Sequence, residues 1–275
     1  MSYKNVLHDS PLSKSEAYPS SYDPSLLFPV ARQLQREGLS LGSKLPFTGV
    51  DIWNAYEISW LDPKGKPVMA VGEFTFPCTT TNIIESKSLK LYLNSLNETR
   101  FNSLEEVVEI IRRDLTQAAG GKCIVVLKKH HAWIGTPWTH CEGTCIDDIN
   151  VDIDTYKLDS NLLKVGTGST KESLYSHLLK TNCPITNQPD WATMFVHYVG
   201  PQIDHASLLR YLISYRLHQD FHEHCAESIF TDILNHCKPS KLTVYLRYTR
   251  RGGLDINPYR TNEESLPANL RLFRQ

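Results

Sequence analysis

The sequence lacks several features that would assign it at once to a large class of proteins. No apolar run in its 275 residues approaches the roughly 18–20 residues that a membrane-spanning helix needs. The first residues, MSYKNVLHDSPLSKSEAY, have neither the charged start nor the apolar stretch of a signal peptide. A formal net charge of −1 gives no strong attraction for nucleic acid or anionic lipid. We therefore expect a cytoplasmic protein that binds neither membranes nor nucleic acid directly.

Motifs of common nucleotide, disulfide and metal sites are also missing. The segment Val165-Gly-Thr-Gly168 lacks the third glycine of GxGxxG, and there is no Walker loop, which argues against a Rossmann domain. Seven scattered cysteines do not resemble a disulfide framework, so we expect reduced thiols. His140, Cys141 and Cys145 come closest to a zinc site. No second ligand pair follows them, so we predict no metal.

The sequence does contain a pattern of strands and helices that occurs twice. Alternating aromatic and branched residues predict the first strands, and a capping box at Ser103-Leu-Glu-Glu106 opens the second helix. Gly120-Gly121 ends that helix. In chain order, the predicted elements of the first copy are strands 50–61 and 68–76, helices beginning near Glu85 and Ser103, and strand 123–129.

The same order recurs in the second half of the chain. Its predicted elements are strand 193–199, helices 207–217 and 226–234, and strand 242–248. A shift of 119 residues aligns the two copies without a gap, so that Ser88 meets Ser207 and Leu115 meets Leu234. This constant offset indicates an internal duplication. The implied module is strand-strand-helix-helix-strand, an α+β arrangement with helices on one face of a sheet. We predict an extension (1–45), a first module (46–145), a connector (146–170) and a second module (171–275).

The strongest local feature is the segment from Thr181 to Asp190, TNCPITNQPD. Its two prolines and two asparagines predict a stiff loop. We expect Cys183 in this loop to be reachable by solvent or ligand, and Cys123, in an apolar strand, to lie in the core. The carboxyl group of Asp190 returns to the thiol if the prolines bend the loop. Most loop cysteines near an aspartate are inert, so the loop alone does not establish a nucleophile.

Three other segments carry groups suited to a ligand. Glu85-Ser-Lys-Ser-Leu-Lys90 places hydroxyls and two lysines at a helix start, where an anion binds well, although an ordinary solvated first turn is the simpler interpretation. Arg250-Arg-Gly-Gly253 is either a solvated turn or a grip for phosphate. The glutamate of Phe221-His-Glu223 usually only complements a helix dipole.

Together these segments resemble the 7-cyano-7-deazaguanine (preQ0) reductases, the QueF family, in their long two-module form. The family's E-S-K-S-hydrophobic-K-L-Y signature is complete from Glu85 to Tyr92, and its C-P-x-T-x-Q-P-D loop is complete from Cys183 to Asp190. The likeness continues through YDPSLLFP, DIWNAYEISWL, FHE and RRGG. Several specific motifs in the right order make chance agreement improbable.

The resemblance implies a fold, a reaction and an assembly. The fold is the tunnelling fold (T-fold), in which tandem modules with antiparallel sheets and helices on one face assemble into a barrel. The reaction reduces the nitrile of preQ0 to the aminomethyl group of preQ1 in queuosine biosynthesis and consumes two NADPH. The expected assembly is a homodimer. Because the signature and the cysteine lie in different modules, the site is expected at a module or subunit seam.

The resemblance also implies residue roles. Cys183 and Asp190 are the catalytic pair; the substrate-binding residues are Ile84, Glu85, Ser86, His222 and Glu223, and the NADPH-binding residues are Ser86, Lys87, Arg251 and Gly252. A thiolate that adds to the nitrile carbon gives a thioimide, which accepts hydride more readily. Asp190 would protonate the nitrile nitrogen, and the Glu223 carboxylate would accept two ring donors side by side. Two alternatives are a thiol-dependent nitrile hydrolase and a non-catalytic nucleobase-binding module.

Overall fold

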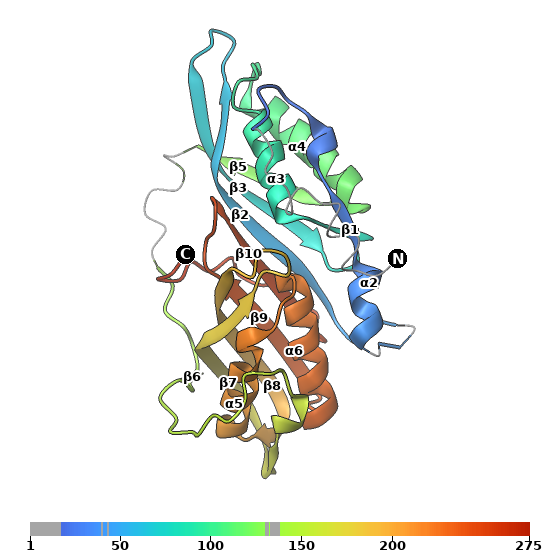
Figure 1. Cartoon of the computed structure of the whole chain (residues 1–275), viewed down its shortest axis with the longest axis vertical. Helices are drawn as coiled ribbons and strands as arrows, with labels where there is room; N and C mark the ends of the chain where they lie inside the picture. The colour runs from blue at the N-terminus through green and yellow to red at the C-terminus, as the bar shows by residue number, and fades with distance from the viewer. Residues whose placement is uncertain (1–17, 40, 43, 130–131, 133–137) are drawn as a thin grey trace. The chain divides into compact units, whose positions relative to one another are not determined.

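The protein, described here by a computed structural model, divides into two compact units, each built from more than one stretch of chain (Figure 1). The structure describes residues 18–39, 41–42, 44–129, 132 and 138–275. Unit 1 comprises Met1–Gly38, Asp51–Pro137 and Arg250–Asp255, and unit 2 comprises Leu39–Val50, Trp138–Thr249 and Ile256–Gln275. The predicted extension lies partly outside the described residues, and the predicted module boundaries stay a prediction.

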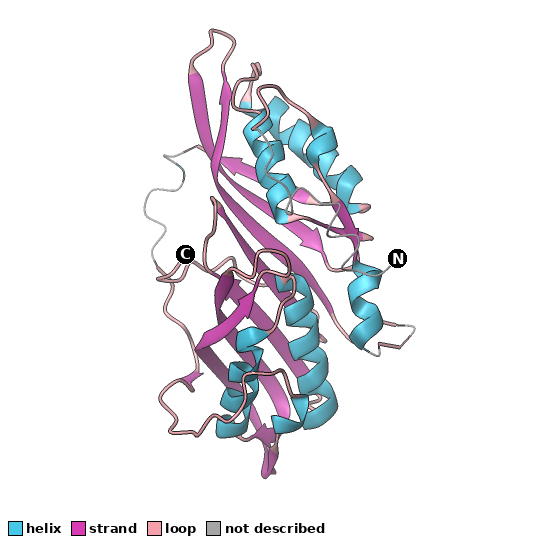
Figure 2. Cartoon of the chain, viewed as in Figure 1, coloured by secondary structure: helices cyan, strands magenta, loops and turns pink. Residues whose placement is uncertain are grey.

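Unit 1 contains a sheet in the order β5-β3-β2 with two helices on one face (Figure 2). Its elements are η2 (Pro24–Leu26), β1 (Pro29–Ala31), α2 (Arg32–Arg36), β2 (Thr48–Leu61, from residue 51 on), β3 (Pro67–Pro77), β4 (Asn82–Ile84), α3 (Ser86–Ser95), α4 (Leu104–Ala119) and β5 (Ile124–Lys128); a short turn η3 (Glu37–Leu39) follows α2. The capping box is confirmed, because Ser103 Oγ accepts from Glu106 N at 3.2 Å. Gly120 ends α4 in the left-handed region, with φ 63°.

Unit 2 repeats this arrangement with longer strands. Its elements are β6 (Thr144–Cys145), η5 (Ser160–Leu162), β7 (Val165–Asn182), β8 (Pro189–Ile203), α5 (His205–Ser214), η6 (Tyr215–Leu217), α6 (His222–Cys237), β9 (Lys241–Tyr248) and β10 (Leu254–Thr261, from residue 256 on). The strand order is β10-β9-β8-β7-β6, antiparallel except that β6 runs parallel to β7. Helix α6 packs on β9 and β8. The α+β class is therefore confirmed.

Two long strands, β7 and β10, lie where the sequence predicted none, as do the short strands β1, β4 and β6. Strand β7 occupies 18 residues, and its first six overlap the predicted connector. It was missed because its first half is polar and exposed. Strand β10 was missed because it buries polar residues, including Asp255, Asn257 and Arg260, along with its apolar ones. Alternation of apolar and polar residues marks a strand only where one face meets solvent.

The duplication extends further than the sequence comparison reached. In unit 1, Ser88 Oγ donates to Glu85 O (2.6 Å) and accepts from Phe28 N (3.0 Å). At the end of the same helix, Ser95 Oγ accepts from Asp23 N at 3.2 Å. These bonds fasten the segment before the first strand to helix α3.

Unit 2 has the same bonds on equivalent residues. Ser207 Oγ donates to Asp204 O (2.7 Å) and accepts from Lys164 N (3.0 Å). Ser214 Oγ accepts from Asp159 N at 3.4 Å. Part of the predicted extension and part of the predicted connector are therefore corresponding segments of the two copies of the repeat. The alignment missed them because the offset there, from Asp23 to Asp159, is 136 residues rather than 119.

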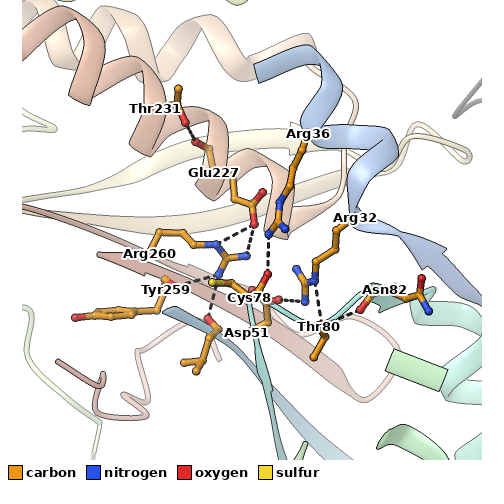
Figure 3. A network of polar contacts seen from close by, with 11 residues as sticks. Arg32, Arg36, Asp51, Cys78, Thr80, Asn82, Glu227, Thr231, Tyr259 and Arg260 are labelled. Atoms are coloured by element: carbon orange, nitrogen blue, oxygen red, sulfur yellow. Dashed lines mark hydrogen bonds and ion pairs between the residues drawn. The ribbon is translucent and has the colours of Figure 1, made fainter. Parts of the chain in front are cut away.

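Each unit also buries an arginine against a carboxylate (Figure 3). In unit 1, Arg32 pairs with Asp51 at 2.6 Å. In unit 2, Arg260 is fully buried and binds Glu227 Oε1 through both Nε (3.1 Å) and Nη2 (2.9 Å). Its Nη1 donates to Val50 O at 3.3 Å. Buried charges persist only when paired and hydrogen-bonded in this way.

Within the described residues, no helix is long and apolar enough to cross a membrane.

Glu227→Gln should destabilise the protein, because it removes the negative charge that both Arg260 donors face. We expect a loss of about 3–5 kcal/mol in the free energy of unfolding, measured by urea denaturation. Glu263→Gln is the control, since Glu263 pairs at 2.7 Å with an exposed lysine, Lys241. That variant should lose less than about 1 kcal/mol. Equal losses in the two variants would contradict a buried ion pair at Arg260.

Candidate active site

The structure places the predicted site residues in two groups, one in each unit. Unit 2 holds Cys183, Asp190, His222 and Glu223, and unit 1 holds Ile84, Glu85, Ser86, Lys87, Arg251 and Gly252. Each group is built by the local fold of its own unit.

Cys183 stands at the start of a tight turn between β7 and β8. Its N–H donates to Gln188 O (2.9 Å), and its C=O accepts from Asn187 N (3.1 Å). Asn187 occupies the left-handed region, with φ 55°, which asparagine tolerates better than most residues. Strand β8 then begins, and Asp190 lies opposite Thr181 of β7. The predicted loop is thus a turn, and Asp190 belongs to a strand.

Both candidate catalytic side chains are buried. Cys183 is 3% exposed and Asp190 is 6% exposed. The solvent access that we expected for Cys183 is therefore wrong for this conformation, in which backbone bonds close the segment into a turn instead of an open loop. Cys123 lies in the core as predicted, and burial raises the pKa of its thiol.

Helix α6 delivers the histidine and glutamate of the FHE motif. His222 is the first helical residue, and its Nε2 lies 3.5 Å from Asp190 Oδ2. The imidazole ring stacks flat on Tyr248 of β9, with centroids 3.6 Å apart and an interplanar angle of 4°. His222 Nδ1 is buried without a hydrogen-bond partner among the described residues. Glu223, in the first turn, is buried as well. The Nδ1 atom of His222 is therefore a polar group that a ligand can satisfy.

A short backbone pairing, which we call the clasp, ties the end of β7 to the segment before α6. Asn182 N donates to His218 O (2.8 Å), and Asp220 N donates to Asn182 O (3.2 Å). The side chain of Gln219 adds a bond from Nε2 to Asn187 Oδ1 at 2.9 Å. The clasp therefore joins the cysteine turn to the start of the helix that carries His222. Sequence reasoning missed it, because no local pattern marks a pairing between segments so far apart.

In unit 1, Glu85 caps helix α3 with a buried carboxylate. Its Oε1 accepts from Lys87 N (2.6 Å), and its Oε2 accepts from Ser88 N (2.8 Å). Ile84 pairs with Pro29 between β4 and β1, which holds the signature against the N-terminal segment. Burial raises the pKa of Glu85 above its ordinary value, although the two backbone bonds act in the opposite direction.

The RRGG segment forms a tight turn beside helix α3. Arg251 N donates to Leu254 O at 2.8 Å, and Gly252 has φ 60°. Gly252 and Lys90 line the same pocket, of about 430 Å³. A Cβ at Gly252 would lie 3.1 Å from Lys90 Cε, so the bare glycine lets the lysine approach the backbone. A cation beside exposed backbone suits a phosphate. Lys90 was absent from our predicted cofactor residues, although its place in the signature marks it.

Comparisons with known proteins agree with these motifs. Residues 18–127 match a family described as nitrile reductase, 7-cyano-7-deazaguanine-reductase N-terminal part, and residues 189–266 match a QueF-like protein family. An NADPH-dependent 7-cyano-7-deazaguanine reductase of Desulfotalea psychrophila is 55% identical over 274 residues, covering 99% of both chains. The enzyme of that name from Paraburkholderia xenovorans is 52% identical, covering 97% of this chain and 98% of the relative.

The two family matches and the near-complete coverage together define a class, the nitrile reductases. The chain belongs to the 7-cyano-7-deazaguanine reductase (QueF) family, which confirms the predicted resemblance. A crystal structure of the archaeosine synthase QueF-Like in the apo form covers 37% of this chain and 99% of its own, with 15% identity and a TM-score of 0.31. A likeness that remote has no bearing on the fold.

The stability of Glu85→Gln relative to the native chain should increase as the pH rises. The ordinary pKa of glutamate is 4.5, and the pKa of Glu85 in the folded protein is higher. The contribution of Glu85 to the free energy of unfolding is therefore fully present below pH 4.5 and is lost as the pH rises through the pKa of the folded state. Glutamine keeps one acceptor for the helix start where the carboxylate has two, and its contribution to stability does not change with pH. Urea denaturation across a pH series should show the free energy of unfolding of the variant increasing relative to that of the native chain as the pH rises.

Glu105→Gln is the matched control for that experiment. Glu105 lies in the first turn of α4, and hydrogen bonds from its own backbone and from Ser103 lower its pKa. The free energy of unfolding of the native chain should therefore increase relative to that of this variant as the pH rises. A stability difference that does not change with pH for Glu85→Gln would show that its carboxylate carries no burial cost.

Proposed function

We propose that this chain is an NADPH-dependent oxidoreductase that reduces the nitrile of 7-cyano-7-deazaguanine (preQ0) to the aminomethyl group of preQ1, a step of queuosine biosynthesis. The observation that carries the proposal is 55% identity, over 99% of both chains, to a relative with that named activity. Both family motifs are complete at the sites described above. The hydrolase alternative has no use for NADPH, on which the named activity of the relatives depends.

Cys183 is proposed as the nucleophile. Its sulfur adds to the nitrile carbon, so that a C–S bond forms while one C–N π bond breaks, and the nitrogen gains a proton. The product is a thioimide held on the protein. The burial of Cys183 would exclude water from this adduct and so protect it and the later imine from hydrolysis.

Asp190 is proposed as the group that gives the proton to the nitrile nitrogen. It lies across the β7–β8 pair from Thr181, two residues before Cys183, and its carboxyl group contacts the His222 ring. The His222 ring is held by its flat stack on Tyr248, which fixes its position relative to the Asp190 carboxyl group. A positioned acid of this kind typically contributes a factor of about 10²–10⁴ to the rate.

Buried carboxylates are proposed to bind the base. Glu223 accepts the ring N–H and the exocyclic amine side by side, and Glu85 offers a second buried carboxylate. Ile84, Ser86 and His222 are proposed to complete the substrate contacts.

NADPH, when bound, supplies the hydride for each of the two reductions. We propose that Lys87 and Arg251 hold its phosphates, with Ser86 as a hydroxyl donor and Gly252 as the point where its chain approaches the backbone. The proposal of a phosphate at this turn is supported by Lys90, whose side chain lies against Gly252 in the pocket that both residues line.

We propose the assembly on the basis of the same family membership. Modules would associate into a T-fold barrel, with the boundaries given from the sequence, and the chain would act as a homodimer in the cytoplasm. All seven cysteines are free thiols, which fits a reducing compartment.

The covalent step can be tested by intact mass spectrometry of the protein mixed with preQ0 in the absence of NADPH. The native chain should gain the mass of one nitrile, and Cys183→Ala should gain none. Cys237→Ala is the control, because Cys237 is also buried and its pKa is raised to about 11 by that burial. It should form the adduct normally. An adduct on Cys183→Ala, or turnover of the nitrile without loss of NADPH absorbance, would overturn the proposal.

Asp190→Asn should keep substrate binding and lose most of the turnover. We expect kcat to fall by about 10²–10⁴-fold, because the amide cannot donate the proton that the carboxyl group gives. Binding is measured by calorimetry with preQ0, and turnover by NADPH consumption. A variant with a nearly native kcat would remove Asp190 from the mechanism.

A further inference from the structure

Asp220 is a buried carboxylate beside the candidate site with no role so far. It lies between η6 and α6, and its Oδ1 accepts from Phe221 N at 2.8 Å. Its Oδ2 lies 2.5 Å from His224 Nδ1 and 3.5 Å from His218 Nε2. Burial alone would raise its pKa, but the neighbouring His218 and His224 outweigh burial and hold the pKa well below the usual range. Asp220 is therefore an anion between two imidazoles.

The backbone of Asp220 is half of the clasp. Its N–H binds the C=O of Asn182, the residue directly before Cys183. Its side chain binds the first turn of the helix that carries His222 and Glu223. One residue thus contacts both the strand end that presents the nucleophile and the helix start that faces Asp190.

Ordinary helix capping does not explain these contacts. Phe221 is the N-cap residue of α6 and makes no side-chain cap bond. A capping side chain satisfies N–H groups inside the first turn, whereas Asp220 binds the N–H of the cap residue itself and a side chain in the first turn. The bonds of the Asp220 side chain instead orient the backbone that connects the clasp to helix α6.

Unit 1 supplies an internal comparison. There the same clasp holds the end of β2: Leu61 N donates to Thr99 O (2.9 Å), and Phe101 N donates to Leu61 O (2.9 Å). Phe101 occupies the place of Asp220, and the residue after the clasped strand is Asp62 instead of a cysteine. The clasp therefore forms without a carboxylate. A charged residue stands at this position in the unit that carries the thiol.

We infer that Asp220 is a positioning residue for the covalent step: with His218 and His224, it fixes the Cys183 turn relative to the start of helix α6. The inference rests on the proposed function, because it concerns the attack of Cys183 on the nitrile. A displacement of about 1 Å in such a step can cost a factor of about 10².

The test is the rate of adduct formation in Asp220→Asn, measured in single-turnover experiments over a range of preQ0 concentrations without NADPH. Asparagine keeps the size of the side chain and an acceptor for Phe221 N, but loses the charge that holds the two histidines. We expect the maximal rate constant to fall about 10–100-fold. The concentration that gives half of the maximal rate should change less than the rate constant does.

Asp232→Asn is the matched control. Asp232 lies on the same helix and accepts from Tyr211 Oη at 2.6 Å, with a pKa raised by burial. Within the described residues no hydrogen bond or ion pair joins it to the clasp, although its charge also acts on His218, so the variant tests the loss of a helix carboxylate without the loss of a bond to the clasp. Thermal unfolding midpoints of both variants are recorded alongside, and the control should keep the adduct rate within about 2-fold of the native chain.

Each outcome separates the hypotheses. A native rate in Asp220→Asn, or an equal loss of rate in Asp232→Asn, would overturn the inference while leaving the proposed function intact. Failure of the native chain to form any adduct would instead overturn the proposed function. If Asp220→Asn does not fold, His224→Gln removes one of the two imidazoles and should lower the same rate constant; a native rate there contradicts the inference.

Discussion

Two backbone hydrogen bonds at the end of one strand hold the candidate site of unit 2 together. The N–H and C=O of Asn182 bind the segment 218–220, so the next residue, Cys183, leaves the strand in a fixed direction. That segment runs directly into helix α6 and its His222. The strand end and the helix start cannot shift independently while these bonds persist. Covalent chemistry between a thiol and a bound ligand requires this kind of fixed geometry.

Elements with local signals could be predicted from the sequence. The capping box at Ser103 and the left-handed Gly120 bound helix α4 as expected, because both depend on neighbours in the chain. Strand β10 could not be predicted in this way. Its Asp255 and Arg260 are buried by partners far along the chain, such as Asn54 in unit 1 and Glu227 in unit 2. A polar residue gives no strand signal when a distant partner makes its burial tolerable.

The candidate site shows the same division. The motifs located the cysteine turn and the Glu85 signature, because the order of side chains along the chain defines them. The burial of Cys183 was not predictable, since burial depends on the tertiary packing around the turn and the motif specifies only the order of side chains along the chain. The role inferred for Asp220 was equally hidden, because an aspartate before a helix is the commonest of polar signals.

The duplication explains why one fold can carry two different sets of functional groups. Both units present a clasped strand end followed by a residue and a proline, but the residue is Asp62 in unit 1 and Cys183 in unit 2. Conversely, Glu85 reaches two backbone N–H groups at the start of α3, whereas the shorter Asp204 reaches one at the start of α5. The shared backbone bonds carry the fold in both halves, which leaves these positions open to change. Chemistry at each site then depends on a few side chains grafted onto a common scaffold.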